Sequence, residues 1–483
     1  MKKSQITTIA ILFCLAISLS LPVSAAPQMV GETLRISLTN AGGQGNSASQ
    51  YPAISPDGGY IAFQSSADNL VSNDTNGVSD IFVRDTAGGK TIRISVASDG
   101  SQANGASNFP AISVTGRWVA FESAADNLVS GDTNNVVDIF LHDRDTDADG
   151  IYDEAGFIST TRISVNSSGT QALGASNRPY FSPDGRYVAF HSLAANLVSE
   201  DNNDAQDIFV RDLQNHTTVR VSVNSAGEEG DQDSYYPSLS SGGRYVVFQS
   251  TALNLVNGDT NSSNDIFVHD RDTDADGIYD EAGAIQTVRL SVDSDGIQGG
   301  DNSYFPSISG DGRYVVFYSY ASNLIDNDTN FVADVFLHDR DTDADGIYDE
   351  AGFISTTRIS VSSTGEEAND ESYAYRSISE DGRYVVYHSL ASNLADNDTN
   401  GSEDVYLYDI QSGATRRISV ATAGTEGNGD SYFATITANG KYVVFQSNAT
   451  NLISSDTNDA WDCFRHENFV EGKYKVFLPF TRK

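Results

Sequence analysis

Three nearly identical acidic segments hold the carboxylates whose spacing is best suited to chemistry. Each segment reads Asp-Arg-Asp-Thr-Asp-Ala-Asp-Gly-Ile-Tyr-Asp-Glu-Ala-Gly, and the copies begin at Asp143, Asp270 and Asp339. In the first copy, three alternating aspartates precede Gly150, and Asp153 follows shortly after. Alternate carboxylates on a curling loop can all face one hard cation, and the glycine allows the sharp turn. The spacing therefore predicts three calcium sites that order loops and have no catalytic role.

The acidic segments match an EF-hand loop only in part, because the twelfth position counted from Asp145 is Gly156 instead of glutamate. The pattern Asp-x-Asp-x-Asp-Gly-x-x-Asp resembles the calcium loops of thrombospondin type 3 repeats. That resemblance implies four aspartate ligands in each segment: Asp145, Asp147, Asp149 and Asp153; Asp272, Asp274, Asp276 and Asp280; Asp341, Asp343, Asp345 and Asp349. Glu154 and the carbonyl of Ile151 are further candidate oxygens. The alternative is a solvated hairpin closed by Asx turns, which needs no metal.

A second acidic motif recurs seven times, as Asp-x-Asn followed four residues later by Asp. The first copy is Asp74, Asn76 and Asp80, and the last is Asp456, Asn458 and Asp462. Since every repeat contains it, the motif favours an architectural role, in which Asp and Asn side chains form turns and cap a strand entry. A ring of cation or ligand sites on one propeller face is the alternative.

The elements that position these acids are repeated along the chain. Segments of the form Arg-x-Ser-[Val/Leu] begin at Arg35, Arg93, Arg162, Arg220, Arg289, Arg358 and Arg417, at intervals of 58, 69, 58, 69, 69 and 59 residues. The three long intervals contain the three acidic segments. Each unit has four short strand patterns, one of them preceded by an Asp-Gly type turn, as in the stretch SPDGRYVAFHS over residues 182–192.

Four short antiparallel strands bury too little surface to be stable alone, whereas seven such sheets arranged radially bury both faces of each sheet. The repeat therefore predicts an all-β fold, a seven-bladed β-propeller of four-stranded antiparallel blades over residues 33–466. The strand at Arg35 carries the repeat's own sequence but lacks preceding strands, so we expect it to complete the last blade and close the ring. A tail strand over Tyr474 to Leu478 is the alternative.

The turns Ser55-Pro56-Asp57-Gly58 and Ser182-Pro183-Asp184-Gly185, each followed by an aromatic-rich strand, resemble the TolB-type propeller repeat. This repeat is related in architecture to WD-repeat propellers. Other copies lack the Pro-Asp pair but keep the glycine, as in Val114-Thr115-Gly116. The resemblance implies a rigid binding platform and leaves the ligand open.

The ends and the composition suggest an exported protein. Residues 1–25 have the basic start, apolar run and small residues of a signal peptide, and residues 467–483 form a tail outside the repeat. No second long apolar run follows, so we expect no transmembrane span after cleavage and an extracytoplasmic location, secreted, periplasmic or cell-surface. The 66 acidic and 29 basic residues give a formal charge of −37, which disfavours nucleic acid. Cys463 is expected to be a small core residue.

No catalytic motif such as Gly-x-Ser-x-Gly or a P-loop is present in the sequence. We therefore expect a monomeric, non-catalytic binding or scaffold protein whose partner is an extracellular protein or glycan. Aromatic residues on rim loops, such as Tyr235, Tyr304 and Phe305, would serve such binding. The alternative is an extracellular hydrolase or lyase with clustered acids at one end of the channel. The histidines before the acidic segments, His142, His269 and His338, are expected at strand ends on the surface.

Overall fold

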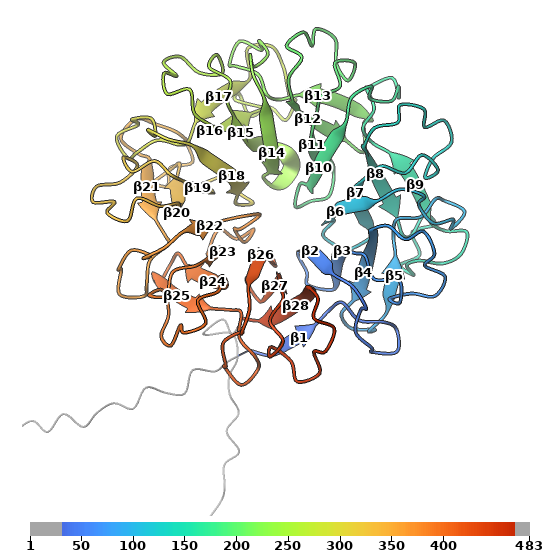
Figure 1. Ribbon diagram of the computed structural model, residues 1–483. Coiled ribbons are helices and arrows are strands. Elements are labelled where there is room, and N and C mark those ends of the chain that lie inside the picture. Colours follow the sequence, from blue (N-terminus) through green and yellow to red (C-terminus); the bar gives the residue numbers. More distant parts are fainter. Residues whose placement is uncertain (1–30, 469–483) are drawn as a thin grey trace, which may run out of the picture.

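The computed structural model describes residues 31–468, so the predicted signal peptide and most of the predicted tail, including the alternative closing strand, lie outside the described residues. Within them, seven four-stranded antiparallel sheets are arranged radially around a central channel (Figure 1). This arrangement confirms the predicted seven-bladed β-propeller. No helix of the described part is long and apolar enough to cross a membrane.

The strands follow the repeat, and in each blade the first of the consecutive strands lies innermost, along the channel (Figure 1). Blade 1 contains β2 (Ser49–Ile54), β3 (Tyr60–Ser65), β4 (Asp80–Asp85) and β5 (Thr91–Arg93); blade 2 contains β6 (Ser107–Ile112), β7 (Trp118–Ser123), β8 (Asp138–Asp143) and β9 (Ser159–Arg162). Blade 3 contains β10 (Ser176–Phe181), β11 (Tyr187–Ser192), β12 (Asp207–Asp212) and β13 (Thr217–Arg220); blade 4 contains β14 (Ser234–Leu239), β15 (Tyr245–Ser250), β16 (Asp265–Asp270) and β17 (Gln286–Arg289), with the 3-10 turn η1 (Ser241–Gly243) after β14. Blade 5 contains β18 (Ser303–Ile308), β19 (Tyr314–Ser319), β20 (Asp334–Asp339) and β21 (Ser355–Arg358); blade 6 contains β22 (Ser372–Tyr373), β23 (Tyr384–Ser389), β24 (Asp404–Asp409) and β25 (Ala414–Arg417). Blade 7 contains β26 (Ser431–Ile436), β27 (Tyr442–Ser447), β28 (Asp462–Glu467) and, from the start of the chain, β1 (Thr33–Arg35).

The N-terminal strand closes the ring, as predicted. β1 pairs antiparallel with β28, and Arg35 lies opposite Phe464. The buried guanidinium of Arg35 forms ion pairs with Asp456 at 2.9 Å and Asp462 at 3.4 Å. The Ser37 hydroxyl donates a 2.5 Å hydrogen bond to Asp462. Blade 7 is therefore built from both ends of the propeller.

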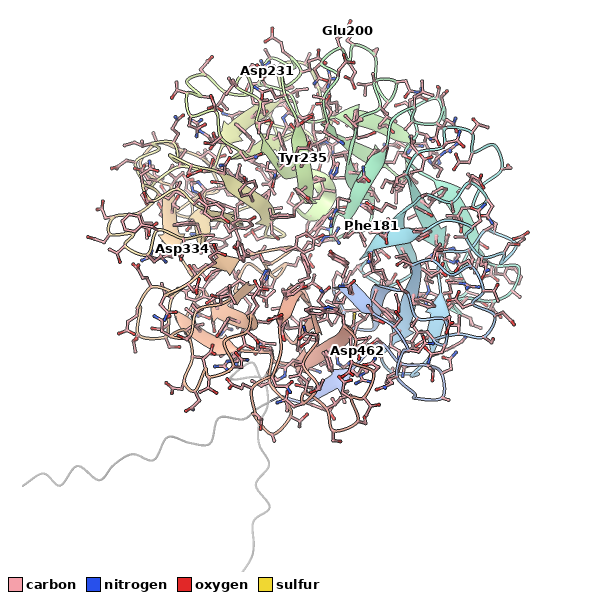
Figure 2. The ribbon with its side chains drawn as sticks, viewed as in Figure 1. Phe181, Glu200, Asp231, Tyr235, Asp334 and Asp462 are labelled. Atoms are coloured by element: carbon pink, nitrogen blue, oxygen red, sulfur yellow. The ribbon has the colours of Figure 1, made fainter. Side chains whose placement is uncertain are left out.

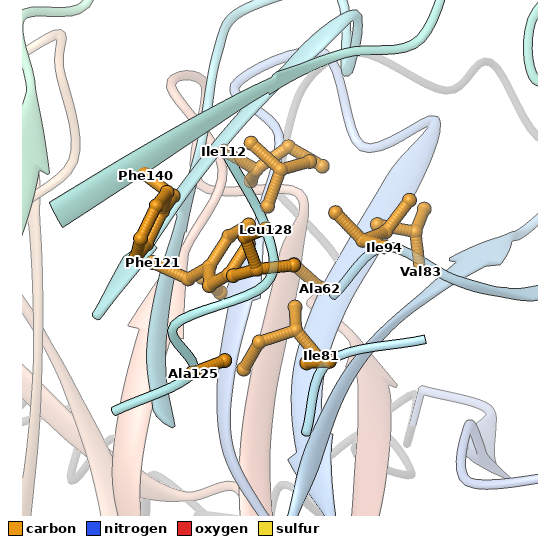
Figure 3. Close-up of a cluster of buried hydrophobic side chains, with 12 residues drawn as sticks. Ala62, Ile81, Val83, Ile94, Ile112, Phe121, Ala125, Leu128 and Phe140 are labelled. Carbon is orange, nitrogen blue, oxygen red and sulfur yellow. The ribbon is translucent and has the colours of Figure 1, made fainter. Parts of the chain in front are cut away.

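The hydrophobic core lies between adjacent blades. Figure 3 shows one such layer, in which Ala62 and Val83 of blade 1 face Ile112, Phe121 and Phe140 of blade 2. Equivalent clusters occupy the other six contacts between blades. Each cluster buries apolar side chains from two neighbouring sheets, so the blades stabilise one another.

The Asp-Gly type turns fit against the preceding blade. Gly116 has a φ of +74°, and a Cβ atom built on it would lie 2.3 Å from the ring of Tyr60 in blade 1. Gly440 meets Tyr384 in the same way, at 2.1 Å. Glycine at this position therefore serves both the turn and the close approach to a tyrosine ring.

The repeated Asp-x-Asn motif joins strands within a blade and anchors the next loop. Asp80 is fully buried at the start of β4, where it accepts hydrogen bonds from Ser95 at 2.5 Å and Asn76 at 2.9 Å. The Asn76 amide also donates to the carbonyl of Ala103 on the way to blade 2. Burial raises the pKa of Asp80. These contacts give the motif a structural role.

Strand order defines two faces. In each blade the turn between the first and second strands and the loop between the third and fourth strands lie at the same end, because the strands are antiparallel. We call this end the hairpin face. The loops between second and third strands, and the crossings between blades, lie at the opposite end, which we call the mouth face.

Candidate functional site

The three acidic segments form compact hairpins between the third and fourth strands of blades 2, 4 and 5. In the first, the Asp145 carboxylate accepts hydrogen bonds from the backbone N–H groups of Asp149 at 3.2 Å and Gly150 at 3.1 Å. Carboxylate oxygens of Asp145, Asp147 and Asp149 lie within 4.8 Å of one another, as do those of the corresponding triads. Those triads are Asp272, Asp274 and Asp276, and Asp341, Asp343 and Asp345. Each group could hold a metal ion.

The fourth predicted ligand of each hairpin lies outside this carboxylate group. Asp153 forms a bidentate ion pair with Arg144, with distances of 2.9 and 2.6 Å. Arg144 is buried between the rings of Tyr60 and Tyr152, at 4.7 and 5.0 Å from their centroids. Glu154 is also outside the group. The equivalent pairs are Asp280 with Arg271 and Asp349 with Arg340.

Arg144 thus fixes the hairpin to the neighbouring blade. It also donates a 2.7 Å hydrogen bond to the carbonyl of Gly116 in its own blade. The cation–π contact with Tyr60 crosses from blade 2 to blade 1. Arg144 therefore holds the base of the hairpin in place, while two carboxylates of the triad, Asp147 and Asp149, are exposed at its tip and Asp145 is buried beneath them.

One further group of close carboxylates is occupied by an arginine. Asp398, Asp404 and Glu426 come together on blade 6, but Arg417 forms ion pairs with all three. Its guanidinium supplies the positive charge that a metal would otherwise bring. This group is structural.

The three histidines that precede the hairpins are buried, which corrects the expectation of a surface position. His142 pairs through Nδ1 with the Thr160 hydroxyl at 2.8 Å, and His269 and His338 have the same partner type. Burial lowers the pKa of each to about 4. The Thr160 hydroxyl also donates to the carbonyl of Val96 in blade 1, so the neighbouring blade covers this side of the sheet.

Seven side chains, one from each blade, form a closed circuit across the channel. The members are, in order, Tyr51, Phe109, Arg178, Tyr236, Phe305, Tyr375 and Phe433. Consecutive centroid distances (to Cζ for Arg178) are 4.5, 3.3, 5.4, 4.2, 5.5, 5.3 and, back to Tyr51, 4.7 Å. Arg376 also spans the channel, donating from blade 6 to the carbonyls of Pro110 and Pro179. The circuit constricts the channel.

A β-bulge directs these side chains inward. Tyr51, Phe109 and Tyr236 have φ values of 50°, 49° and 53°, and the strand register shifts at the same place. The N–H freed from the ladder is satisfied by the preceding blade: Gln64 accepts from Phe109 at 3.0 Å, and Glu122 accepts from Arg178 at 2.9 Å. Burial raises the pKa of Glu122.

Replacing Gln64 with methionine should destabilise the propeller by about 1–3 kcal/mol, because the Phe109 N–H then loses its acceptor in a half-buried site. Urea unfolding of the purified protein measures the change. Gln64→Glu is the matched control, since it keeps an acceptor oxygen, as Glu122 does in blade 2. Equal losses in the two variants would contradict the role assigned to this hydrogen bond.

The predicted rim aromatics lie at the mouth of the channel but on strands instead of loops. Tyr235 and Tyr304 are the second residues of β14 and β18, and Phe305, the third residue of β18, is a member of the channel circuit; Tyr235 is seen beside the channel in Figure 2. Carboxylates accompany them: the Tyr235 hydroxyl donates to Asp233 at 3.0 Å. Burial and the neighbouring charges of Asp430 and Glu371 raise the pKa of Glu403 to about 7. Aromatic residues, which are expected of a binding site, and clustered carboxylates, which are expected of an enzyme site, therefore both occur at the mouth of the channel.

No known protein family and no characterised protein sequence matches the chain. Among solved structures, a putative TolB from Agrobacterium tumefaciens is 17% identical with a TM-score of 0.34, over 64% of this chain and 80% of that one. TolB from Acinetobacter baumannii is 15% identical with a TM-score of 0.36, over 76% and 62%. An oligogalacturonate lyase in complex with manganese is 10% identical with a TM-score of 0.48, over 91% and 98%. By its own strand pairing and repeat, the chain is a seven-bladed β-propeller.

Proposed function

We propose that the protein is a non-catalytic binding platform outside the cytoplasm, with three hairpins ordered by calcium. The observation that carries the calcium part is the threefold recurrence of a carboxylate triad within 4.8 Å, each wrapped by its own backbone N–H groups. The N-terminal signal-like segment and the acidic charge support an extracytoplasmic location. The partner is a protein or a glycan.

Calcium suits these triads because it takes several carboxylate oxygens at once in flexible geometry. Partial desolvation and repulsion from Asp149 raise the pKa of Asp147. The pKa of Asp343 is raised for the same reasons, with Asp341 and Asp345 as the neighbouring carboxylates. A bound divalent cation would relieve this repulsion. Because Arg144 and its equivalents already fix the hairpin base, binding orders only the tip.

Titration of the chelator-treated protein with Ca²⁺ should show three bound ions per chain by isothermal calorimetry. Each site would stabilise the fold by about 2.7 kcal/mol when Ca²⁺ is at about 100 times its Kd, which raises the Tm. Asp147→Asn should remove one ion of the three. Asp295→Asn, an exposed acid outside the hairpins, is the control and should leave three. The absence of both heat and a Tm shift would refute calcium binding.

The mouth face is the proposed binding surface. Its half-buried tyrosines and their carboxylates lie above a channel that the aromatic circuit constricts, so a partner is held at the surface of the ring. A rigid ring with an amphipathic mouth is suited to holding a ligand without changing shape.

A hydrolase or lyase is the second candidate, and Glu403 favours it. Its carboxylate has a pKa of about 7, in the range that a general acid or base requires, and it lies near Asp430 and Glu371. Incubation of the protein with a ligand that it binds, followed by analysis of the recovered ligand, distinguishes the two functions. A non-catalytic protein leaves the ligand chemically unchanged. An enzyme would cleave it, and Glu403→Gln would abolish the cleavage.

A further inference from the structure

The seven blades differ most clearly at the mouth of the channel. At the start of the inner strand, blades 1–3 read Ala-Ser-Gln or Ala-Ser-Asn, ending at Gln50, Asn108 and Asn177. Blades 4–7 read Asp-Ser-Tyr, Asn-Ser-Tyr, Glu-Ser-Tyr and Asp-Ser-Tyr, ending at Tyr235, Tyr304, Tyr373 and Tyr432. The central serine is kept throughout and pairs with a second serine in every blade, as Ser49 does with Ser65. The fold therefore tolerates either set, and the difference concerns the surface.

The tyrosines of blades 5–7 join other rings in a continuous arc. We call this arc the mouth crescent; it comprises Tyr304, Tyr318, Tyr373, His388, Tyr432 and Trp461. Consecutive centroids are 5.4, 5.1, 5.6, 5.8 and 4.8 Å apart. Burial lowers the pKa of His388 to about 3, so it contributes a neutral ring. His388 is buried and links the neighbouring rings, whereas the four tyrosines and Trp461 are half-buried and offer aromatic surface on one side of the mouth.

Polar groups without partners lie on blades 1–3 of the mouth and, as Glu403, on blade 6. Among residues 31–468, the side-chain amides of Gln50, Asn108 and Asn177 have no hydrogen-bond partner, and neither does the Glu403 carboxylate. Two other carboxylates are oriented by tyrosines of the mouth, since the Tyr373 hydroxyl donates to Glu371 and the Tyr235 hydroxyl donates to Asp233. The mouth thus presents amide donors and acceptors on one side and carboxylate acceptors on the other.

Resting on the binding function proposed above, we propose that the mouth binds an oligosaccharide, whose sugar rings stack on the crescent while its hydroxyls bond to the amides and carboxylates. Sugar rings have apolar C–H faces that pack on aromatic faces and hydroxyls that both donate and accept. The crescent extends over three blades, which fits several linked sugars. The constriction below it keeps the chain on the surface.

A cationic partner fits the mouth less well. Carboxylates and aromatic faces would attract a lysine or arginine side chain. However, Arg178 and Arg376 lie in the channel just beneath, and the guanidinium of Arg178 is 5.4 Å from the Tyr236 ring. A cation, which only donates, would also leave the N–H donors of the three amides unused. A neutral saccharide can contact the aromatic faces, the amides and the carboxylates at the same time.

Calorimetric titration of the full chain with cellohexaose, mannohexaose, xylohexaose and chitohexaose tests the proposal. At least one of them should bind with a Kd below about 1 mM. Tyr432→Gln and Tyr304→Asn, which introduce residues that blades 1–3 carry at this position, should each weaken that binding about tenfold or more. Phe331→Asn is the matched control, because Phe331 is an 82% exposed aromatic in the β19–β20 loop of the mouth face, outside the crescent.

The proposal is overturned if none of the four sugars binds, or if the two tyrosine variants bind like the parent. Binding of hexalysine in place of the sugars, lost in the same variants, would also overturn it and assign the mouth to a cationic partner. Chain-length analysis of the recovered sugar separates this inference from the proposed function. A bound and cleaved sugar upholds the ligand class and refutes the non-catalytic function, whereas unchanged calcium binding without any sugar binding refutes only this inference.

Discussion

Arg35→Met should lower the free energy of unfolding by about 3–5 kcal/mol, because it leaves two buried carboxylates without their cation. The Arg35 side chain is 2% exposed, and its partners Asp456 and Asp462 are 4% and 0% exposed. The substitution weakens the contact between β1 and β28, where the ring closes. Urea denaturation followed by tyrosine and tryptophan fluorescence measures it.

Arg186→Met is the matched control, since this arginine is 38% exposed and forms an ion pair with Asp212 on the hairpin face. Asp212 is 7% exposed, but it keeps hydrogen bonds from the backbone N–H groups of Gln214 and Asn215 when the arginine is removed, and the arginine itself is solvated, so we expect a loss of about 1 kcal/mol. Adding Asp456→Asn to Arg35→Met should recover part of the loss by removing one of the unpaired charges. A loss in Arg35→Met no larger than in Arg186→Met would contradict the importance of this buried pair.

Gly116→Ala should destabilise the propeller by about 2–4 kcal/mol, since two costs combine. The φ of +74° is strained for any L-residue with a Cβ atom, and the new methyl group would lie 2.3 Å from the Tyr60 ring. Thermal unfolding monitored by circular dichroism gives the change in Tm.

Gly131→Ala separates the two costs. Gly131 has a φ of +83°, but nothing lies within 4 Å of the position that its new methyl group would occupy, so only the backbone strain of about 1–2 kcal/mol applies. If both alanine variants lose the same stability, the Tyr60 contact is not what requires glycine. A larger loss at Gly116 assigns the difference to the seam between blades 1 and 2.

The propeller could be predicted from the sequence because its signals are local and repeated. Asp-Gly type turns, alternating strands and the interval between Arg-x-Ser segments count the blades without any knowledge of long-range contacts. Ring closure could be predicted as well, since the segment at Arg35 has the sequence of a fourth strand. The register of β1 with β28 agrees with that interpretation.

The site was less predictable because its geometry depends on contacts between blades. Asp153 has the spacing of a ligand, but the sequence does not reveal that Arg144 folds back to pair with it. The channel circuit depends on a bulge that breaks strand alternation, and in blade 6 on an extra residue near Ala374. The sequence did contain one signal of the mouth site: the residue after the first serine of the inner strand changes from Gln or Asn in blades 1–3 to Tyr in blades 4–7. This change points to a site only when the seven copies are aligned in space.

The pairing of β1 with β28 sets an order on biosynthesis. The strand that completes blade 7 is the first of the propeller to be made, and its partner, from Asp462 to Glu467, is the last. Until β28 has been made, β1 is an unpaired strand with free backbone hydrogen-bonding groups. Any other unfinished copy of the chain nearby carries the same unpaired strand. At high concentration, exchange of β1 between two chains competes with closure within one, because both use the same hydrogen bonds. We therefore expect domain-swapped dimers joined through blade 7 when the chain refolds at high concentration, and we expect dilution to suppress them.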